Sequence, residues 1–168
     1  MFFFPISDDN ESNSKPYICY CLIGICCFIF LWQNALPINL NQSAIYNFGV
    51  IPAAVLGDQQ GLIHPYLTIF TSMFMHGGWM HLIGNMVFLW IFGDNIEDSM
   101  GHKKFLVFYL LSGIFAALLQ ASIDPSSSVP MIGASGAIAG LLGAYLVLHP
   151  RANVNVLFWL FIFITVIK

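Results

Sequence analysis

Residues 131–140 read MIGASGAIAG, and they place one serine between glycines at the start of an uncharged, apolar segment. From Gly133 to His149 that segment contains no Asp, Glu, Lys or Arg. As a helix it would be about 25 Å long, which is less than a hydrocarbon core of about 30 Å, so we expect it to begin below the membrane surface. Free N–H groups and a positive dipole end would then lie beside Ser135 in a protein-lined cavity. Such a place suits an oxyanion.

The composition indicates an integral membrane protein. Hydrophobic residues make up 58% of the chain and charged residues only 8%, against about 25% charged residues in an average soluble domain. We therefore expect an all-α fold, a polytopic bundle of transmembrane helices in one compact domain within a lipid bilayer. The net charge of −3 comes without a basic patch or stripe, so no nucleic-acid partner is expected.

The first span is expected to be retained, because residues 1–16 do not resemble a cleavable signal peptide. Asp8, Asp9 and Glu11 stand where a positively charged region should precede the apolar run. The four cysteines all lie within residues 19–27, without a histidine beside them. They are interpreted as packed or lipid-facing side chains and predict neither a metal site nor a disulfide.

Five apolar spans are predicted after this polar tail. They cover residues 17–32, 79–92, 104–120 and 133–149, and a fifth span starts near Val154 and is cut off at Lys168. Gly93-Asp94 is expected to end the second span, with a charged turn over residues 94–103. The connection over residues 33–66 is interrupted by prolines, and its length predicts a functional loop at the outer interface. The predicted organisation is a tail, residues 1–16, and a membrane domain, residues 17–168.

Basic residues set the expected orientation. If Lys15 is cytoplasmic, alternate connections place Lys103, Lys104 and Arg151 on the same side, as the positive-inside rule requires. The opposite connections, residues 33–78 and 121–132, contain no Lys or Arg. The second and fourth spans therefore both start at the outer side, where their first residues can meet.

Polar side chains mark the start of the second span. His81 and Asn85 are four residues apart and share one helical face. They are either functional donors, as intramembrane polar groups usually are, or hydrogen-bonding contacts between helices worth about 0.6 kcal/mol. His76 beside Gly77-Gly78 is interpreted as structural. A metal site on His76 and His81 is disfavoured, because their spacing is off-face and no third ligand lies at that depth.

Glycines surround the serine. Gly136 and Gly140 form a G-x-x-x-G pattern, which commonly indicates close helix packing, and Gly133 precedes them. Packing and chemistry are compatible, because small residues would hold Ser135 rigidly against the second span.

These residues together resemble the rhomboid family of intramembrane serine proteases. The likeness covers residues 71–151: TSMFMHGGWMHLIGN at 71–85 resembles the second rhomboid helix, GDNIE at 93–97 the turn after it, and GASG at 133–136 the nucleophile motif. The resemblance implies that Ser135 is the nucleophile. It also implies that His81, Asn85 and the Ser135 backbone N–H form the oxyanion hole, that no cofactor is needed, and that single-span membrane proteins are cut near the outer face.

The sequence departs from the family pattern at three places. The family's general base is a histidine on a sixth helix, and we expect that helix to be missing from this chain, which would then be inactive alone. A Trp-Arg element common in the family reads Leu67-Thr68 here. Glu97 is present, either as a partner of a base or of a backbone N–H or as a solvated carboxylate.

Two functions remain open from the sequence. One is a rhomboid-type endopeptidase in the plasma or inner membrane, with its active site facing outward and its dyad histidine supplied from outside this chain. The other is a rhomboid-like protein that binds client transmembrane helices without cutting them. A transporter fits poorly, because no intramembrane carboxylate offers a coupling site.

Overall fold

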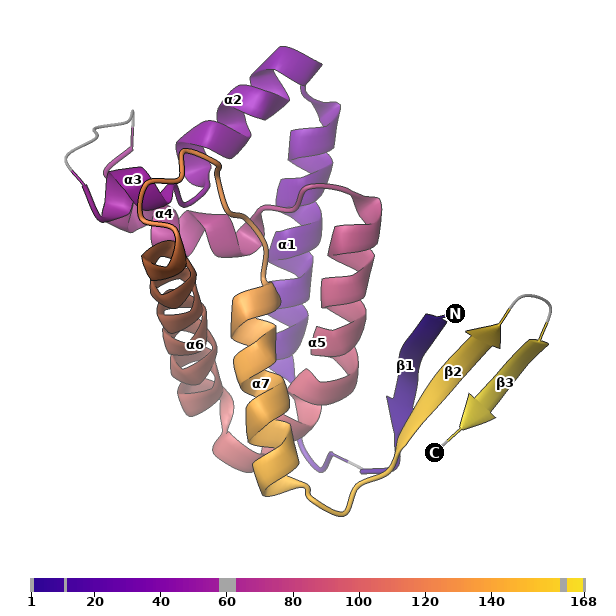
Figure 1. The fold of residues 1–168 in the computed structure, drawn as a ribbon. Helices are drawn as coiled ribbons and strands as arrows, with labels where there is room; N and C mark the ends of the chain where they lie inside the picture. The colour runs from indigo at the N-terminus through magenta and orange to yellow at the C-terminus, as the bar shows by residue number, and fades with distance from the viewer. Residues whose placement is uncertain (1, 11, 58–62, 161–162, 168) are drawn as a thin grey trace.

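Helices form most of the structure. The computed structural model describes residues 2–10, 12–57, 63–160 and 163–167 (Figure 1). Its elements in chain order are β1 (Phe2–Asp8), α1 (Tyr17–Ala35), α2 (Ile38–Phe48), α3 (Pro52–Val55), α4 (Pro65–Thr71), the 3₁₀ turn η1 (Ser72–Phe74), α5 (Trp79–Met100), α6 (His102–Ile123), α7 (Ser135–Leu148), β2 (Val154–Leu160) and β3 (Phe163–Ile167). The predominantly helical architecture agrees with the expected fold class.

The four long helices α1, α5, α6 and α7 form one bundle. Helix α5 contacts the other three, and α7 packs on both α5 and α6. Helices α5 and α7 run in the same direction, so both begin at the end of the bundle where α2, α3 and α4 lie (Figure 1). The bundle core consists of fully buried side chains, among them Cys19, Leu89, Ile96, Phe105, Tyr109 and Leu141.

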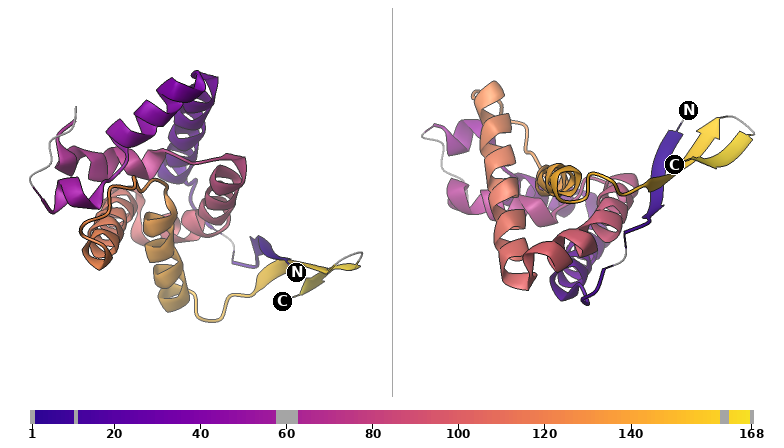
Figure 2. Two further views of the ribbon diagram at one scale, coloured as in Figure 1. Left: turned by 45° about the horizontal axis from the view of Figure 1, so that its top comes forward. Right: turned by 90° about the horizontal axis from the view of Figure 1, so that it is seen from below.

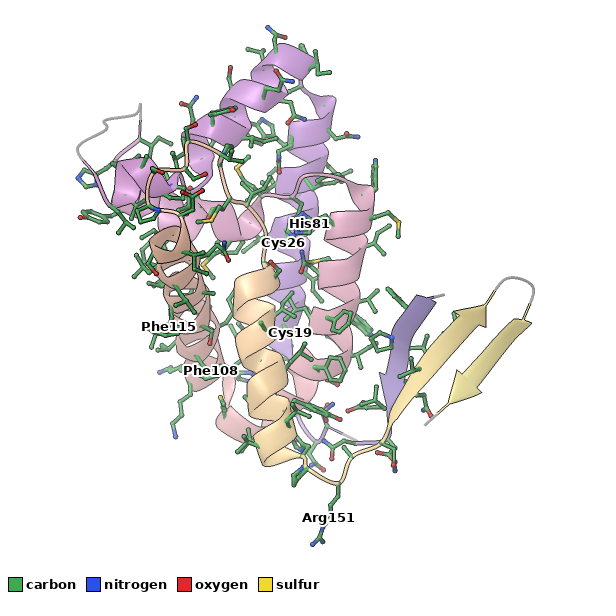
Figure 3. The ribbon with its side chains drawn as sticks, viewed as in Figure 1. Cys19, Cys26, His81, Phe108, Phe115 and Arg151 are labelled. Atoms are coloured by element: carbon green, nitrogen blue, oxygen red, sulfur yellow. The ribbon has the colours of Figure 1, made fainter. Side chains whose placement is uncertain are left out.

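The bundle surface is apolar. Within the described residues, α1 and α6 are long and apolar enough to cross a bilayer, and α7 is apolar but only 14 residues long. Leu111, Phe115 and Leu119 of α6 are exposed, and Phe115 points away from the bundle (Figure 3). These features indicate insertion into a membrane, whereas the crossing of the bilayer by several spans stays a prediction.

A buried carboxylate joins α5 to the start of α1. Helix α1 follows Pro16 without a side-chain cap and without an acidic residue in its first turn. Glu97 of α5 is fully buried and accepts hydrogen bonds from the backbone N–H groups of Ile18, at 2.9 Å, and Cys19, at 2.7 Å. His102 contacts the same carboxylate. A negative charge at a helix start stabilises its free N–H groups and its dipole, so α5 supplies the cap that α1 lacks.

The predicted end of the second span was wrong. Helix α5 continues through Gly93-Asp94 to Met100, and the supposed charged turn is its last part. Gly93 lies inside the helix, and its lack of a side chain makes room for α1: a Cβ there would lie 2.8 Å from the Cys19 Sγ. The helix ends instead at Gly101, whose φ of +79° suits glycine. Helix α6 begins at once, at His102 rather than near Lys104.

The connection over residues 33–66 contains α2, α3 and the first residues of α4, and it is tied to the chain before α7. Val50 and Met131 exchange backbone hydrogen bonds of 3.0 and 2.8 Å, and the Ala53 N–H donates to the Ser127 carbonyl at 3.1 Å. The Thr71 hydroxyl donates to the Phe48 carbonyl at 2.6 Å. These contacts anchor the connection in a chain that lacks the Trp-Arg element.

The predicted fifth helical span was also wrong, since β2 and β3 occupy residues 154–160 and 163–167. Strand β2 pairs antiparallel with β1 and with β3, with Phe4 opposite Leu157 and Val156 opposite Ile167. The three-stranded sheet extends to one side of the bundle and carries both described ends of the chain (Figure 2). Its segments are rich in Val, Ile and aromatic residues, which favour strands. The supposed polar tail therefore contains a strand.

We predict that Gly140→Ala destabilises the bundle, whereas Gly143→Ala in the same helix does not. A Cβ at position 140 would lie 2.5 Å from the Ser112 Cβ of α6, whereas one at position 143 has nothing within 4 Å. Overpacking costs about 1–3 kcal/mol, and Ala in place of an open helical Gly gains up to about 1 kcal/mol. Thermal unfolding in detergent measures both variants, and equal shifts would contradict this packing.

We predict that Glu97→Ala lowers the free energy of unfolding by about 1.5–3 kcal/mol, because the start of α1 loses its hydrogen bonds to a charged acceptor. Asp98→Ala is the matched control, since that neighbouring residue is only half-buried and its carboxylate accepts hydrogen bonds from Asn13 and Ser14, outside α1. Denaturant titration in mixed micelles compares the two variants. An effect of Asp98→Ala as large as that of Glu97→Ala would contradict the role of the buried cap.

Candidate active site

Ser135 is the first residue of α7, and its neighbours fix the approach of the chain to that helix. Gly133 has a φ of +125°, and its N–H donates to the Ser72 carbonyl at 2.9 Å. The Ala134 carbonyl accepts the first helical hydrogen bond from Ile138 at 3.0 Å. The N–H groups of the first turn, including that of Ser135, therefore have no acceptor within the helix. They are available to an anion next to the serine hydroxyl.

The His81 ring lies against Gly133. A Cβ at position 133 would be 2.7 Å from both Nε2 and Cε1 of His81, and 3.8 Å from the Ser135 Oγ. The edge of the ring and the serine hydroxyl are thus both close to the same point. The His81 side chain lies near the start of α7 (Figure 3). Position 133 must be glycine for two reasons: the left-handed backbone and the space that His81 takes.

Hydrogen bonding assigns the tautomer of His81. The Gly77 N–H donates to the Nδ1 of His81 at 3.4 Å, so Nδ1 acts as the acceptor. In a neutral imidazole the other nitrogen then carries the proton. The resulting Nε2–H group is the one on the side of Gly133, where it can donate to a developing negative charge.

Asn85 supplies a second donor one helical turn further along α5. Asn85 is 8% exposed, and its Nδ2 has no hydrogen-bond partner among the described residues. Buried amide groups in folded proteins are almost always hydrogen-bonded. An unpartnered buried donor on the same face as His81 is therefore a candidate for binding a ligand oxygen.

Gln33 fixes the chain just before α5. This buried residue of α1 donates from Nε2 to the His76 carbonyl at 3.3 Å, and its Oε1 accepts the His76 N–H at 3.1 Å. This contact could not be predicted from the sequence, because a lone glutamine at the end of an apolar run has no periodic partner. Gln33 thus fixes the backbone just before α5, and with it the position of His81 in the first turn of that helix.

His76 lies behind His81 and is 1% exposed. The two ring centroids are 5.2 Å apart in an edge-to-face arrangement, and neither nitrogen of His76 has a hydrogen-bond partner within the described part of the chain. Burial, together with the nearby His81, lowers the pKa of His76 to about 4. His76 is thus neutral at pH 7 and packs against the candidate donor. No group of three ligand side chains that could hold a metal occurs among the described residues.

A small cavity of about 200 Å³ opens beside Ser135. Its walls come from η1, α6, α7 and the chain before α7, and they include Ser72, Met73, Gly113 and Gln120. Gly136 and Gly140 let α7 pack closely on α6. A Cβ at position 136 would lie 2.6 Å from the Ala116 Cβ, and one at position 140 would lie 2.5 Å from the Ser112 Cβ.

The other predicted site residue, Glu97, and three further histidines lie away from Ser135. Glu97 and His102 are at the opposite end of α5. His149 follows α7, about 20 Å along the helix from Ser135, and binds Ser99 at 3.1 Å. His64 stacks on Tyr66 in the connection before α4. The structure brings together Ser135, His81 and the glycines, with Asn85 one turn from His81.

The match to a family model and the matches to individual proteins agree on one family. The family model of the Rhomboid domain matches residues 64–168. RHOMBOID-like protein 5 of Arabidopsis thaliana is 35% identical over 78 residues, 46% of this chain and 25% of that protein. Rhomboid protease GluP of Bacillus subtilis is 29% identical over 134 residues, 80% of this chain and 25% of that protein. Rhomboid protein 1, mitochondrial, of Saccharomyces cerevisiae is 31% identical over 100 residues, 57% of this chain and 29% of that protein. The chain thus spans about a quarter of the length of these relatives.

We predict that His76 makes the fold sensitive to acid. Because its pKa falls from the usual 6.5 to about 4 on folding, the unfolded chain binds more protons between these values, and stability drops as the pH falls from 6.5 to 4. His76→Gln should lose less stability than the wild type over this interval. His64→Gln, a change in an exposed histidine, is the control and should keep the wild-type loss. Melting temperatures at pH 7 and 4.5 measure the effect, and equal losses in all three proteins would contradict it.

Proposed function

The chain belongs to the rhomboid family, and we propose that it carries the nucleophile and the oxyanion hole of an intramembrane serine endopeptidase. The observation that carries the proposal is the closeness of the His81 ring and the Ser135 hydroxyl to one point at Gly133: they lie 2.7 and 3.8 Å from a Cβ placed there. The unpartnered Nδ2 of Asn85 supports it. A nucleophile at the start of α7 together with two donors on the neighbouring helix α5 fits acyl transfer better than helix packing alone.

The proposed reaction follows from these groups. A base takes the proton of the Ser135 hydroxyl while Oγ attacks the carbonyl carbon of a peptide bond. The carbonyl oxygen becomes an oxyanion, which accepts hydrogen bonds from the Ser135 N–H, His81 Nε2–H and Asn85 Nδ2. The base then protonates the leaving amine, and water hydrolyses the acyl ester. Each preorganised donor contributes about 10²–10³ to the rate.

The proposed general base is a histidine outside residues 1–168. The chain has five histidines: His81 is assigned to the oxyanion hole, and His76 is buried behind it. His64, His102 and His149 contact other parts of the molecule. On this proposal, these residues cleave nothing until the base is supplied by another segment or polypeptide.

The proposed substrates are single-span membrane proteins cut near the outer face. Helix α7 is about 21 Å long, so its start would lie below the surface of a bilayer of about 30 Å. The cavity of about 200 Å³ beside Ser135 suits a small substrate side chain. With the N-terminus cytoplasmic, the site faces outward in the plasma or inner membrane.

Binding of client helices without cleavage is the second candidate. An apolar groove of about 580 Å³ lies between α1, α5 and β1, and Cys27, Trp79, Met86 and Trp90 are among its lining residues. A groove of this kind favours contact with an apolar segment and needs no nucleophile. The two candidate functions differ in whether a bound transmembrane segment is cleaved.

We predict that Ser135→Ala abolishes cleavage of a model single-span substrate in proteoliposomes by the protein in its native assembly. Ser99→Ala is the matched control, because Ser99 forms a separate serine–histidine contact with His149. It should leave cleavage unchanged. Asn85→Ala should reduce kcat about 10²–10³-fold with the melting temperature preserved. Cleavage that persists in Ser135→Ala would exclude this serine as the nucleophile, and binding without cleavage by the wild type would favour the second candidate.

A further inference from the structure

The N-terminal segment contacts the two helices of the candidate site at their far ends. Asp8 is the last residue of β1, and one of its carboxylate oxygens, Oδ2, accepts two hydrogen bonds. The first comes from the Asn95 Nδ2 of α5 at 2.8 Å, and the second from the Tyr145 hydroxyl of α7. One oxygen atom thus joins two helices that are separate in sequence.

The two donors, Asn95 and Tyr145, lie at the same distance along their helices from the residues of the candidate site. Asn95 follows Asn85 by ten residues in α5, and Tyr145 follows Ser135 by ten residues in α7. Both helices run in the same direction (Figure 1), so each donor lies about 15 Å further along than its site residue. The Asp8 contact therefore holds α5 and α7 together about 15 Å further along the two helices than the candidate site.

Both donors of this contact are buried, whereas Asp8 itself is half-buried. Asn95 and Tyr145 are 1% and 3% exposed, and the Tyr145 ring packs edge-to-face on Phe92 of α5 at 4.9 Å. Asn10 of the same segment donates to the Asn95 Oδ1, and Ser12 donates to the Asp94 carboxylate at 3.1 Å. Loss of Asp8 would leave the buried Tyr145 hydroxyl without this acceptor, which is costly. The Asn95 Nδ2 would keep only its longer contacts, to the Asp94 Oδ1 at 3.1 Å and the Ile91 carbonyl at 3.4 Å.

We propose that Asp8 is a positioning residue, which sets the spacing of α5 and α7 and thereby the placement of His81 and Asn85 against Ser135. The catalytic part of this inference rests on the proposed function. Helices are stiff over 15 Å, so a shift at the Asp8 contact reaches the site, where a misplacement of about 1 Å can cost about 10²-fold in rate.

The first test measures the spacing itself and does not depend on catalysis. Spin labels are placed at exposed positions near the starts of α5 and α7, by Met80→Cys and Ala139→Cys, with Cys21 and Cys27 replaced by serine. Asp8→Ala should shift or broaden the distance distribution. Asp8→Asn should restore it, because both hydrogen bonds go to one oxygen, which the asparagine carbonyl can replace. Tyr145→Phe, which removes one bond, should fall between them.

The second test is the cleavage rate of the protein in its native assembly. Asp8→Ala should lower kcat at least about tenfold with KM unchanged, and Asp8→Asn should recover it. Ser7→Ala is the matched control, since Ser7 precedes Asp8 in β1, is exposed, and accepts a hydrogen bond from the Asn155 Nδ2 of β2 at 3.0 Å. It should change neither readout. An unchanged distance distribution in Asp8→Ala overturns the inference, and so does an Asp8→Asn variant as defective as Asp8→Ala. A changed distribution in a protein whose wild type cleaves nothing supports the spacing and rejects the proposed function.

Discussion

The buried carboxylate of Glu97 is the interaction on which the arrangement of the helices depends. It lies in the bundle interior and accepts the first N–H groups of α1, so it connects two helices by a charged contact that has no substitute in the sequence of α1. At the other end of α1, Gln33 binds both backbone groups of His76. Helix α1 is thereby fastened to the α5 segment at both ends, with Cys19 packed on Gly93 between them. This rigid pair presents His81 and Asn85 in a fixed direction.

Small residues perform the matching task for α7. Gly136 and Gly140 let α7 approach α6, and Gly133 turns the chain so that His81 reaches the start of the helix. The candidate site therefore lies where two stiff pairs, α1 with α5 and α6 with α7, meet. A site built in this way needs little adjustment when charge develops, which is what an oxyanion hole requires. The N-terminal segment adds a contact between the pairs at the opposite end through Asp8.

The ends of several elements were predicted wrongly from the sequence, whereas the roles of the candidate site residues stay predictions. Ser135, His81 and Asn85 could be found because polar groups in apolar spans are rare and their spacing is helical. Gly93 was mistaken for a helix end because an isolated glycine usually weakens a helix, whereas its close contact with Cys19 is made only in the folded chain. Residues 154–160 were expected to be helical because a short apolar run has no period that separates strand from helix. Gln33 and Asp8 act through partners 43 and 87 or more residues away, and a single sequence carries no sign of such pairs.

The most direct measurement is a structure of the protein in its native assembly after reaction with a fluorophosphonate, a reagent that phosphonylates activated serines. The proposed active site predicts a phosphorus atom bonded to the Ser135 Oγ. It also predicts a phosphonyl oxygen within about 3.2 Å of the His81 Nε2 and the Asn85 Nδ2. Reaction at another serine, or an adduct on Ser135 whose oxygen points away from both donors, would contradict it.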